Sequence, residues 1–235
     1  GDLDLVVGSG GNERTSPENF KSRLYLNNGK GVFTKSKTAI PSASANVAVI
    51  APYDYDQDGD QDVAVMGQSP TGAVTKVYKN DNGNFVDTNQ NFVKMYAGDI
   101  AWVDINKDGW LDLAVSGSDG SGPLTQIYIN NEGTSFTSTI DYGLPQLFST
   151  KMAWGDLDND GDIDLAITGV DATDKFQFNI YYRQDNENKF TPESKTVNTQ
   201  SGNFGVFNSN YQGVIEGDIK IVDLELDCDN DIVYN

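Results

Sequence analysis

An acidic nine-residue motif that recurs at a nearly constant interval is the feature that most constrains the fold of this chain. Its first residue is Asp54, Asp104 and Asp156 in turn, at intervals of 50 and 52 residues. Acidic or amide residues occupy positions 1, 3 and 5, glycine occupies position 6, and aspartate occupies position 9. A weaker copy starts at Asp223, 67 residues after the third. A period of about 50 residues is typical of the blades of a β-propeller, so the motif predicts a protein built from repeated units.

The spacing within the motif predicts a cage of oxygen atoms for a hard cation. Ca²⁺ takes about six to eight oxygen ligands, and short side chains at positions 1, 3 and 5 of a tight loop can converge on one point. Glycine at position 6 permits the sharp turn, because it adopts positive φ at little cost. Position 7 varies in type, which fits a residue that donates only its backbone carbonyl, whereas aspartate at position 9 is suited to closing the shell with both oxygens. The competing interpretation is a solvated acidic turn without an ion.

We therefore predict Ca²⁺ sites in the three full copies and a weaker site in the last copy. The predicted ligands are Asp54, Asp56, Asp58, Asp60 and Asp62; Asp104, Asn106, Asp108, Trp110 and Asp112; Asp156, Asp158, Asp160, Asp162 and Asp164; and, in the last copy, Asp223, Glu225, Asp227, Asp229 and Asp231. In that last copy Glu225 is longer than aspartate, and Cys228 stands where the other copies have glycine. A residue with a Cβ atom costs about 1 kcal/mol or more at positive φ. We expect this loop to bind weakly or to turn differently.

The residues around the motif predict strands and not the helices of an EF-hand. Position 12, where an EF-hand loop needs glutamate, is Val65, Val115 or Ile167. Each repeat contains four short strand patterns: an apolar one before the motif, one after it, a third with alternating aromatic residues, and a fourth centred on phenylalanine. The strand pairs expected around the motif span 46–51 and 63–67, 99–103 and 113–117, and 151–154 and 165–169. No segment shows a sustained helical period, so we expect almost no helix.

These patterns predict an all-β chain folded as a β-propeller of four-stranded blades, because radial stacking covers both faces of each sheet. The strand before the motif is continuously apolar, so we expect it to be innermost and buried on both faces. Trp102 and Trp154 are expected to pack between blades, although a sugar-stacking platform is the alternative. We expect a single propeller that divides into 1–45 (partial blade), 46–97, 98–148, 149–212 (with a longer outer region) and 213–235 (partial blade).

Composition excludes several classes of function. The chain has 35 acidic and 16 basic residues, a formal net charge of −19, no histidine and one cysteine. A histidine-dependent triad, a histidine-ligated zinc site and an internal disulfide are therefore impossible. The negative charge argues against nucleic acid as a partner, and no apolar run is long enough for membrane insertion. The chain opens at Gly1 within a motif, without an initiator methionine, so we expect it to be part of a longer protein.

The segments 54–67, 104–117 and 156–169 resemble the FG-GAP/VCBS repeat family, whose calcium-loop propeller repeats also occur in integrin α-subunit heads. The resemblance covers nearly the whole chain outside 195–212. It implies a propeller, usually of seven blades, with Ca²⁺ bound between the first two strands of a blade. It also implies an extracellular or cell-surface location. A seven-bladed ring at this period needs about 350–400 residues, so the chain is expected to form part of a ring.

Three functions remain open on this reading. The first, which we favour, is a calcium-stabilised scaffold for adhesion or for binding a protein or glycan ligand at the cell surface, with structural ions and no enzyme activity. The second is a propeller module of a secreted polysaccharide-degrading enzyme, although the sequence marks no base or nucleophile outside the loops. The third is a self-assembling structural subunit of an extracellular filament. Residues 195–212 lengthen one repeat and are the expected partner-specific surface.

Overall fold

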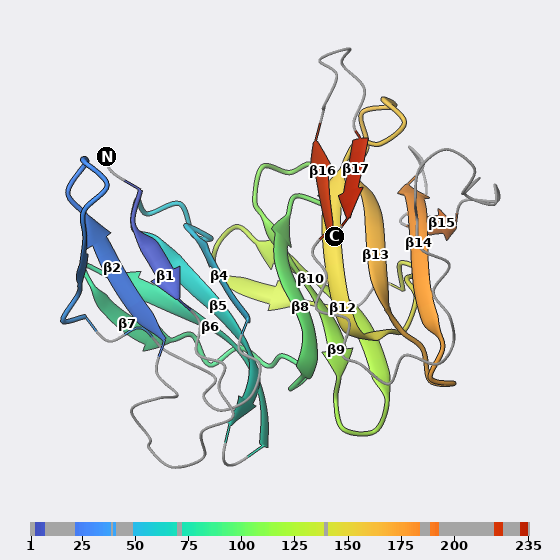
Figure 1. Ribbon diagram of the computed structural model, residues 1–235, viewed down its shortest axis with the longest axis horizontal. Helices are drawn as coiled ribbons and strands as arrows, with labels where there is room; N and C mark the ends of the chain where they lie inside the picture. The colour runs from blue at the N-terminus through green and yellow to red at the C-terminus, as the bar shows by residue number, and fades with distance from the viewer. Residues whose placement is uncertain are drawn as a thin grey trace.

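The computed structural model describes residues 3–7, 22–38, 40, 49–69, 72–138, 141–183, 189–192, 219–222 and 231–234, and these residues contain strands but no helix. The strands form five antiparallel sheets, and in Figure 1 the four-stranded sheets follow one another along the long axis of the molecule. The expectation of an all-β chain is confirmed. Among the described residues, no helix is long and apolar enough to cross a bilayer.

Three of the sheets have four strands each, in which sequence neighbours pair as hairpins. They comprise β4 (Val49–Tyr53), β5 (Asp62–Ser69), β6 (Gly72–Asp81) and β7 (Asn84–Asp87); β8 (Tyr96–Val103), β9 (Asp112–Ser118), β10 (Pro123–Asn131) and β11 (Ser135–Thr137); and β12 (Phe148–Gly155), β13 (Asp164–Val170), β14 (Phe176–Arg183) and β15 (Phe190–Pro192). All four strand types expected in each repeat are present, in the expected order. Such sheets fit the blades of a β-propeller.

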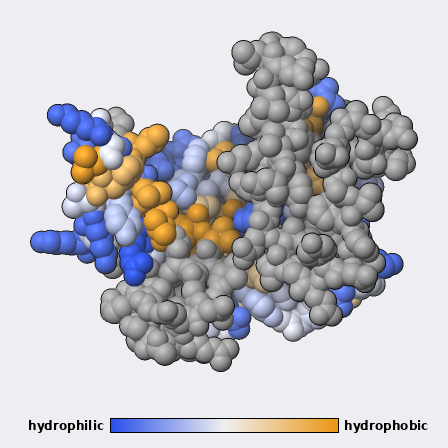
Figure 2. Space-filling model, in the orientation of Figure 1, coloured by the Kyte–Doolittle hydropathy of each residue, from blue (hydrophilic) through white to orange (hydrophobic). Residues whose placement is uncertain are grey.

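The remaining strands form smaller sheets. A three-stranded sheet contains β1 (Leu5–Val7), β2 (Arg23–Asn27) and β3 (Phe33–Lys35), and a two-stranded sheet contains β16 (Ile219–Val222) and β17 (Asp231–Tyr234). In the first of these, Leu5, Leu26 and Phe33 are each 45% or more exposed. Figure 2 shows apolar surface on the side of the molecule where β1 and β2 lie. This sheet therefore buries less apolar surface than the three that follow it.

The first strands of successive sheets lie next to one another. β8 contacts both β4 and β12, and β12 also contacts β16. Figure 1 shows β8 and β12 adjacent near the middle of the molecule, with β13, β14 and β15 following β12 outward in that order. Strands that precede the motif are thus innermost, as predicted. Over the described residues the sheets do not close into a ring, and the seven-bladed ring stays a prediction.

The expectation that these inner strands are buried on both faces is wrong. β4 has no fully buried residue, whereas the first six residues of β5, and six of the seven residues in each of β9 and β13, are buried. The physical reason is position in the sheet. The second strand has hydrogen-bonded neighbours on both edges and other sheets against its faces, while the first strand leaves one edge unpaired. A continuous run of apolar residues in the sequence does not show whether the first or the second strand of a sheet is the more buried.

The hydrophobic core lies between adjacent sheets. Trp102 of β8 stacks on Tyr55 at 6.1 Å between ring centroids, and its indole Nε1 donates to the Ala51 carbonyl at 3.0 Å. Trp154 of β12 packs against Phe190 at 5.9 Å. Both tryptophans therefore pack against aromatic residues of the core clusters among the four-stranded sheets.

Candidate metal centre

The three full copies of the motif form the turns that join the first two strands of the four-stranded sheets. We name them loop 1 (54–62, between β4 and β5), loop 2 (104–112, between β8 and β9) and loop 3 (156–164, between β12 and β13). Their backbones turn alike, with φ of +98° at Gly59, +88° at Gly109 and +88° at Gly161. These angles are readily adopted only by glycine, so position 6 has the role expected from the sequence.

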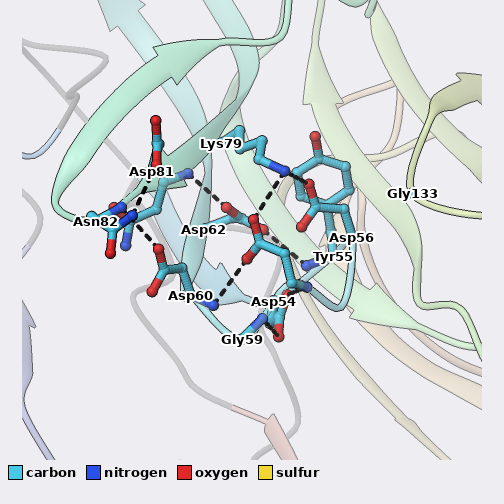
Figure 3. A network of polar contacts seen from close by, with 12 residues as sticks. Asp54, Tyr55, Asp56, Gly59, Asp60, Asp62, Lys79, Asp81, Asn82 and Gly133 are labelled. Atoms are coloured by element: carbon cyan, nitrogen blue, oxygen red, sulfur yellow. Dashed lines mark hydrogen bonds and ion pairs between the residues drawn. The ribbon is translucent and has the colours of Figure 1, made fainter.

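The aspartate at position 1 of each loop closes the turn. In loop 1, the carboxylate of Asp54 accepts the backbone N–H groups of Asp58 and Gly59, each at 3.0 Å. Figure 3 shows this carboxylate next to the backbone of Gly59. Asp104 and Asp156 make the same pair of bonds to positions 5 and 6 of their own loops. The position-5 carboxylate in turn accepts the N–H of position 7. The repeat is thus one of geometry as well as sequence.

The aspartate at position 9 joins the loop to the sheet. Asp62, Asp112 and Asp164 are completely buried, and both oxygens of each accept backbone N–H groups. One bond comes from position 2 of the same loop, at 3.1, 3.0 and 2.8 Å respectively. The other comes from the end of the third strand, where the donors are Asn80 at 2.7 Å, Asn130 at 2.7 Å and Arg183 at 2.9 Å. Sequence reasoning identified these residues as ligands and missed this structural role.

Burial also affects the ionisation of the three position-9 residues. Loss of water around the carboxyl groups is the largest effect, and it raises the pKa of Asp62, Asp112 and Asp164 to about 6 in each case. The backbone hydrogen bonds oppose this shift, and neighbouring loop carboxylates add to it. A bound divalent cation reverses such a shift, because it favours the ionised form.

Carboxylate oxygens converge in loop 1 and in loop 3. Asp54, Asp56 and Asp58 each place one oxygen within 4.8 Å of the others, and Asp156, Asp158 and Asp164 do the same. In loop 1, Oδ1 of Asp56 is buried and has no hydrogen-bond partner. A buried acceptor without a donor is costly. The donor set and this unpaired oxygen together fit a hard, oxygen-preferring cation such as Ca²⁺.

Loop 2 differs from its neighbours at position 3. Asn106 replaces the carboxylate there, and its Nδ2 donates to Asp108 Oδ2 at 2.8 Å. Its Oδ1 accepts the N–H of Asp108 at 3.1 Å. The amide thus supports the turn while lowering the negative charge of the loop. Because Trp110 also stands where the other loops have aspartate at position 7, loop 2 has two carboxylates fewer than loop 1 or loop 3.

Position 7 has side chains that take part in other contacts. Asp60 accepts the N–H of Asn82 at 2.8 Å, which ties loop 1 to the turn after β6. The ring of Trp110 lies close to Gly133, where an added Cβ atom would come within 3.1 Å of it. These contacts agree with a backbone role for position 7 in ion binding, which stays a prediction.

The loops also contact one another across the sheets, which the sequence did not reveal. Position 4 has positive φ in all three loops: +55° at Gln57, +59° at Lys107 and +59° at Asn159. Gln57 of loop 1 donates through Nε2 to the carbonyl of Gly109 in loop 2 at 3.0 Å. Lys107 of loop 2 forms an ion pair with Asp162 of loop 3. The loops therefore lie in a row at one end of the sheets.

A lysine reaches into loop 1 from the third strand of its own sheet. Lys79 of β6 forms ion pairs with Asp56 and, at 2.9 Å, with Asp58. Figure 3 shows its ammonium group directed at the carboxylate of Asp56. The two ion pairs raise the pKa of Lys79 well above its usual value. The pKa of Asp58 is lowered, chiefly by the hydrogen bond from the backbone of Asp60 and next by its contact with Lys79.

Two sets of predictions fall outside the described residues. In the weaker copy, Asp223, Glu225, Asp227 and Asp229 are not among them, and only the backbone of Asp231, the first residue of β17, is described. The expected partner surface at 195–212 is also outside.

Comparison with known proteins identifies the repeat. Residues 1–65, 54–115 and 104–167 each match the model of the FG-GAP-like repeat, so the matches extend over most of the chain. Each match ends in the strand that follows a motif. No curated protein matches the chain significantly.

Proposed function

The chain belongs to the FG-GAP-like repeat family, and from that premise we propose that it is a calcium-stabilised β-propeller scaffold that binds a protein or glycan ligand. The observation that carries the proposal is the convergence of three carboxylate oxygens in loop 1 and again in loop 3. The two loops share their hydrogen-bond pattern although their residues lie about 100 positions apart. Positions 1 and 3 belong to the converging set in both loops, and the third member is position 5 in loop 1 and position 9 in loop 3.

The ions in this proposal are structural. When bound, Ca²⁺ supplies positive charge that neutralises the carboxylates gathered in each loop. The side chains at positions 1, 3, 5 and 9, which are aspartates except for Asn106 in loop 2, are the ones that would hold it. Because the ion binds the folded state, it adds about 2.7 kcal/mol of stability per site when free calcium is 100 times the Kd. The loops then hold the first two strands of each blade at a fixed angle.

An extracellular or cell-surface location fits this mechanism. Extracellular calcium-binding modules have dissociation constants as weak as about 10⁻⁴–10⁻³ M, which cytosolic calcium cannot fill. Each position-9 carboxylate already accepts two backbone hydrogen bonds, one on each oxygen, so moderate affinity is expected. Repeats of this family form integrin-like propeller modules, and adhesion or ligand binding is the role that we propose for this one.

Binding is favoured over catalysis by where the tyrosines lie. With no histidine in the chain, a tyrosine is a natural alternative as base or acid. Four tyrosines, Tyr55, Tyr128, Tyr142 and Tyr181, are buried in the cores between sheets. Burial is the largest cause of their raised pKa, and it brings the pKa of Tyr55 to about 12. These groups support packing and are poorly placed for proton transfer.

Calcium titration followed by calorimetry and thermal melting tests the proposal. After a chelator has removed any calcium, the protein is expected to take up at least two calcium ions, with a marked rise in melting temperature. Magnesium at the same concentration should have a smaller effect, because it demands a tighter octahedral site and keeps its water. If calorimetry detects no heat of binding and calcium does not change the melting temperature, the loops are acidic turns only.

A further inference from the structure

We propose that Asn130 is a positioning residue that couples calcium binding in loop 1 to calcium binding in loop 2. The inference rests on the proposed calcium function and adds how two of the sites influence each other. Asn130 lies at the end of β10 and is only 1% exposed. Its backbone N–H holds the position-9 carboxylate of Asp112 in loop 2, and its side chain reaches loop 1 as well.

The side-chain amide of Asn130 bonds to two successive loops. Nδ2 donates to the carbonyl of Leu111, position 8 of loop 2, at 3.0 Å, and to the carbonyl of Tyr55, position 2 of loop 1, at 2.9 Å. Oδ1 accepts the N–H of Gly133, in the turn after β10, at 2.9 Å. The NH₂ group of asparagine has two donors, so each loop receives one of them.

Part of this arrangement recurs in the two preceding sheets. Asn27 and Asn80 also end a third strand, and each donates Nδ2 to the carbonyl just before the first-listed aspartate of its second strand, that of Leu3 at 3.1 Å and that of Gln61 at 3.0 Å. Each also accepts the N–H of a turn glycine with Oδ1. The asparagine is therefore a regular support of its own loop, and Asn130 adds a bond to the loop of the preceding sheet.

The added bond acts on the part of loop 1 that carries its ligands. Tyr55 lies between Asp54 and Asp56, two of the residues whose oxygens converge. The turn that Asn130 holds also abuts this segment, because a Cβ atom on Gly133 would come within 2.7 Å of Asp56 Cα. Oδ1 of Asp56 is buried without a hydrogen-bond partner. Loop 1 is thus positioned by the sheet that follows its own.

Coupling follows because one side chain supports both loops. An ion in loop 2 would hold the Leu111 carbonyl and the Asp112 carboxylate, which fix Asn130 in turn. A fixed Asn130 presents Nδ2 to the Tyr55 carbonyl, which lowers the cost of ordering loop 1. Coupling between two sites is reciprocal, so an ion in loop 1 favours loop 2 equally. We expect these two loops to fill cooperatively.

The position-6 glycines provide a readout for each loop. Gly59, Gly109 and Gly161 each donate their N–H to the position-1 aspartate of their own loop. In a calcium titration of the ¹⁵N-labelled protein, Asn130→Ala should raise the midpoints of the Gly59 and Gly109 resonances by about three- to tenfold. The Gly161 midpoint should move least. In chelator, the same variant should speed hydrogen exchange at the Gly59 amide, because loop 1 then opens more often.

The matched control is Asn131→Ala. Asn131 is the next residue of the chain, and its Nδ2 bonds within the same hairpin, to Ser135 Oγ at 3.0 Å. This variant should leave all three midpoints unchanged. A shift of the Gly59 midpoint as large as that of Asn130→Ala would show that any change in this hairpin disturbs loop 1, and would overturn the inference.

A substitution in loop 2 tests the coupling without altering the core. Asp108 is an exposed predicted ligand of loop 2, so Asp108→Asn should weaken the ion there. In the original chain it should also raise the Gly59 midpoint, whereas in the Asn130→Ala background it should not. Gln57→Ala removes the exposed bond from loop 1 to the Gly109 carbonyl and should leave most of the coupling intact.

The outcomes distinguish this inference from the proposed function. If Gly161 responds to calcium but Asn130→Ala leaves the Gly59 midpoint unchanged, the inference is wrong while calcium binding stands. If Asn130→Ala does not fold, Asp108→Asn decides, and an unchanged Gly59 midpoint in that variant overturns the coupling. Coupling that is lost in Gln57→Ala but kept in Asn130→Ala also contradicts it. If none of the three glycines responds to calcium, the proposed function itself fails.

Discussion

At the scale of single residues, the position-9 aspartates combine two roles that conflict in the absence of an ion. A fully buried carboxylate such as Asp112 is costly to ionise, yet its two oxygens are the acceptors that join the loop to β10. The sequence pattern pointed to this residue because aspartate occupies position 9 in every full copy. Its backbone partners could not be predicted, because Asn130 lies 18 residues away on another strand.

Replacing Asp112 by asparagine tests the structural role separately from ion binding. Asp112→Asn keeps the shape of the side chain but turns an NH₂ group toward one of two backbone N–H donors. We expect a loss of about 1.5–3 kcal/mol in the free energy of unfolding, the usual contribution of a hydrogen bond to a charged group. Urea denaturation in the presence of chelator measures it, so that no bound ion contributes.

The matched control for this substitution is Asp174→Asn. Asp174 is exposed at a turn with φ of +59°, a conformation that asparagine tolerates well. The free energy of unfolding of the Asp174→Asn variant should stay within about 0.5 kcal/mol of that of the original protein. Equal stability of the two variants would contradict a fold-supporting role for Asp112.

At the scale of elements, the pairing of β8 with β9 contains a local irregularity that fixes how closely the strands approach. The register shifts between Tyr96 and Asp99, and Ala97 has φ of +50°. A Cβ atom on Gly98 would lie 1.7 Å from the carbonyl oxygen of Ser116. The sequence indicated both strands through their apolar residues. It did not indicate the bulge, because Gly98 has no local signal that separates it from a turn glycine.

Gly98→Ala should therefore push β8 and β9 apart. We expect destabilisation of more than about 2 kcal/mol, since backbone must shift to admit the methyl group. Gly122→Ala is the control, because a Cβ atom there meets nothing within 4 Å. Thermal melting of the two variants side by side is the measurement. A Gly98→Ala protein as stable as Gly122→Ala would show that the strands accommodate the added atom.

At the scale of the whole molecule, the loops connect one sheet to the next as well as turning the chain. Gln57 reaches from loop 1 to Gly109, and Lys107 reaches from loop 2 to Asp162 of loop 3. The carboxylate of Asp162 is only 4% exposed. An ion pair with one buried partner stabilises more than a solvent-exposed pair, because its loss leaves a buried charge.

Lys107→Met should lower the free energy of unfolding by about 1–2 kcal/mol. For a chain of this size, that corresponds to a melting temperature lower by about 2–8 °C. Lys76→Met breaks a pair whose acid, Asp87, is 27% exposed, and should cost less than about 1 kcal/mol. Differential scanning calorimetry of the Lys107→Met and Lys76→Met variants measures both losses of stability. If the Lys76 variant loses more stability than the Lys107 variant, the contact between loops 2 and 3 does not hold the sheets together.

Without calcium, the free energy of unfolding should fall as the pH rises, which is the opposite of the usual direction for carboxylates. The pKa of Asp62, Asp112 and Asp164 is raised to about 6 by burial, so the folded state binds more protons than the unfolded state between about pH 4 and 6. The stability from these groups is complete at low pH and is lost as the pH rises through 6. Carboxylates whose pKa is lowered, such as Asp87, are already ionised at pH 5 and do not oppose this trend.

Denaturation at pH 5 and at pH 7.5 in chelator measures this effect. We expect the free energy of unfolding to be lower at pH 7.5. Excess calcium should restore it there, because the ion binds the ionised carboxylates. A rise in stability from pH 5 to pH 7.5 without calcium would contradict the raised pKa values.

The sequence by itself determined the repeat, the four strands of each unit, the loop between the first two strands and the oxygen-rich character of that loop. These follow from local spacing, since turns, alternation and glycine at position 6 act within a few residues. Only the tertiary structure decided which strand is most buried, which backbone groups Asp62, Asp112 and Asp164 hold, and that Lys79 enters loop 1. Those features depend on residues that meet across strands and sheets, at separations that no local pattern records.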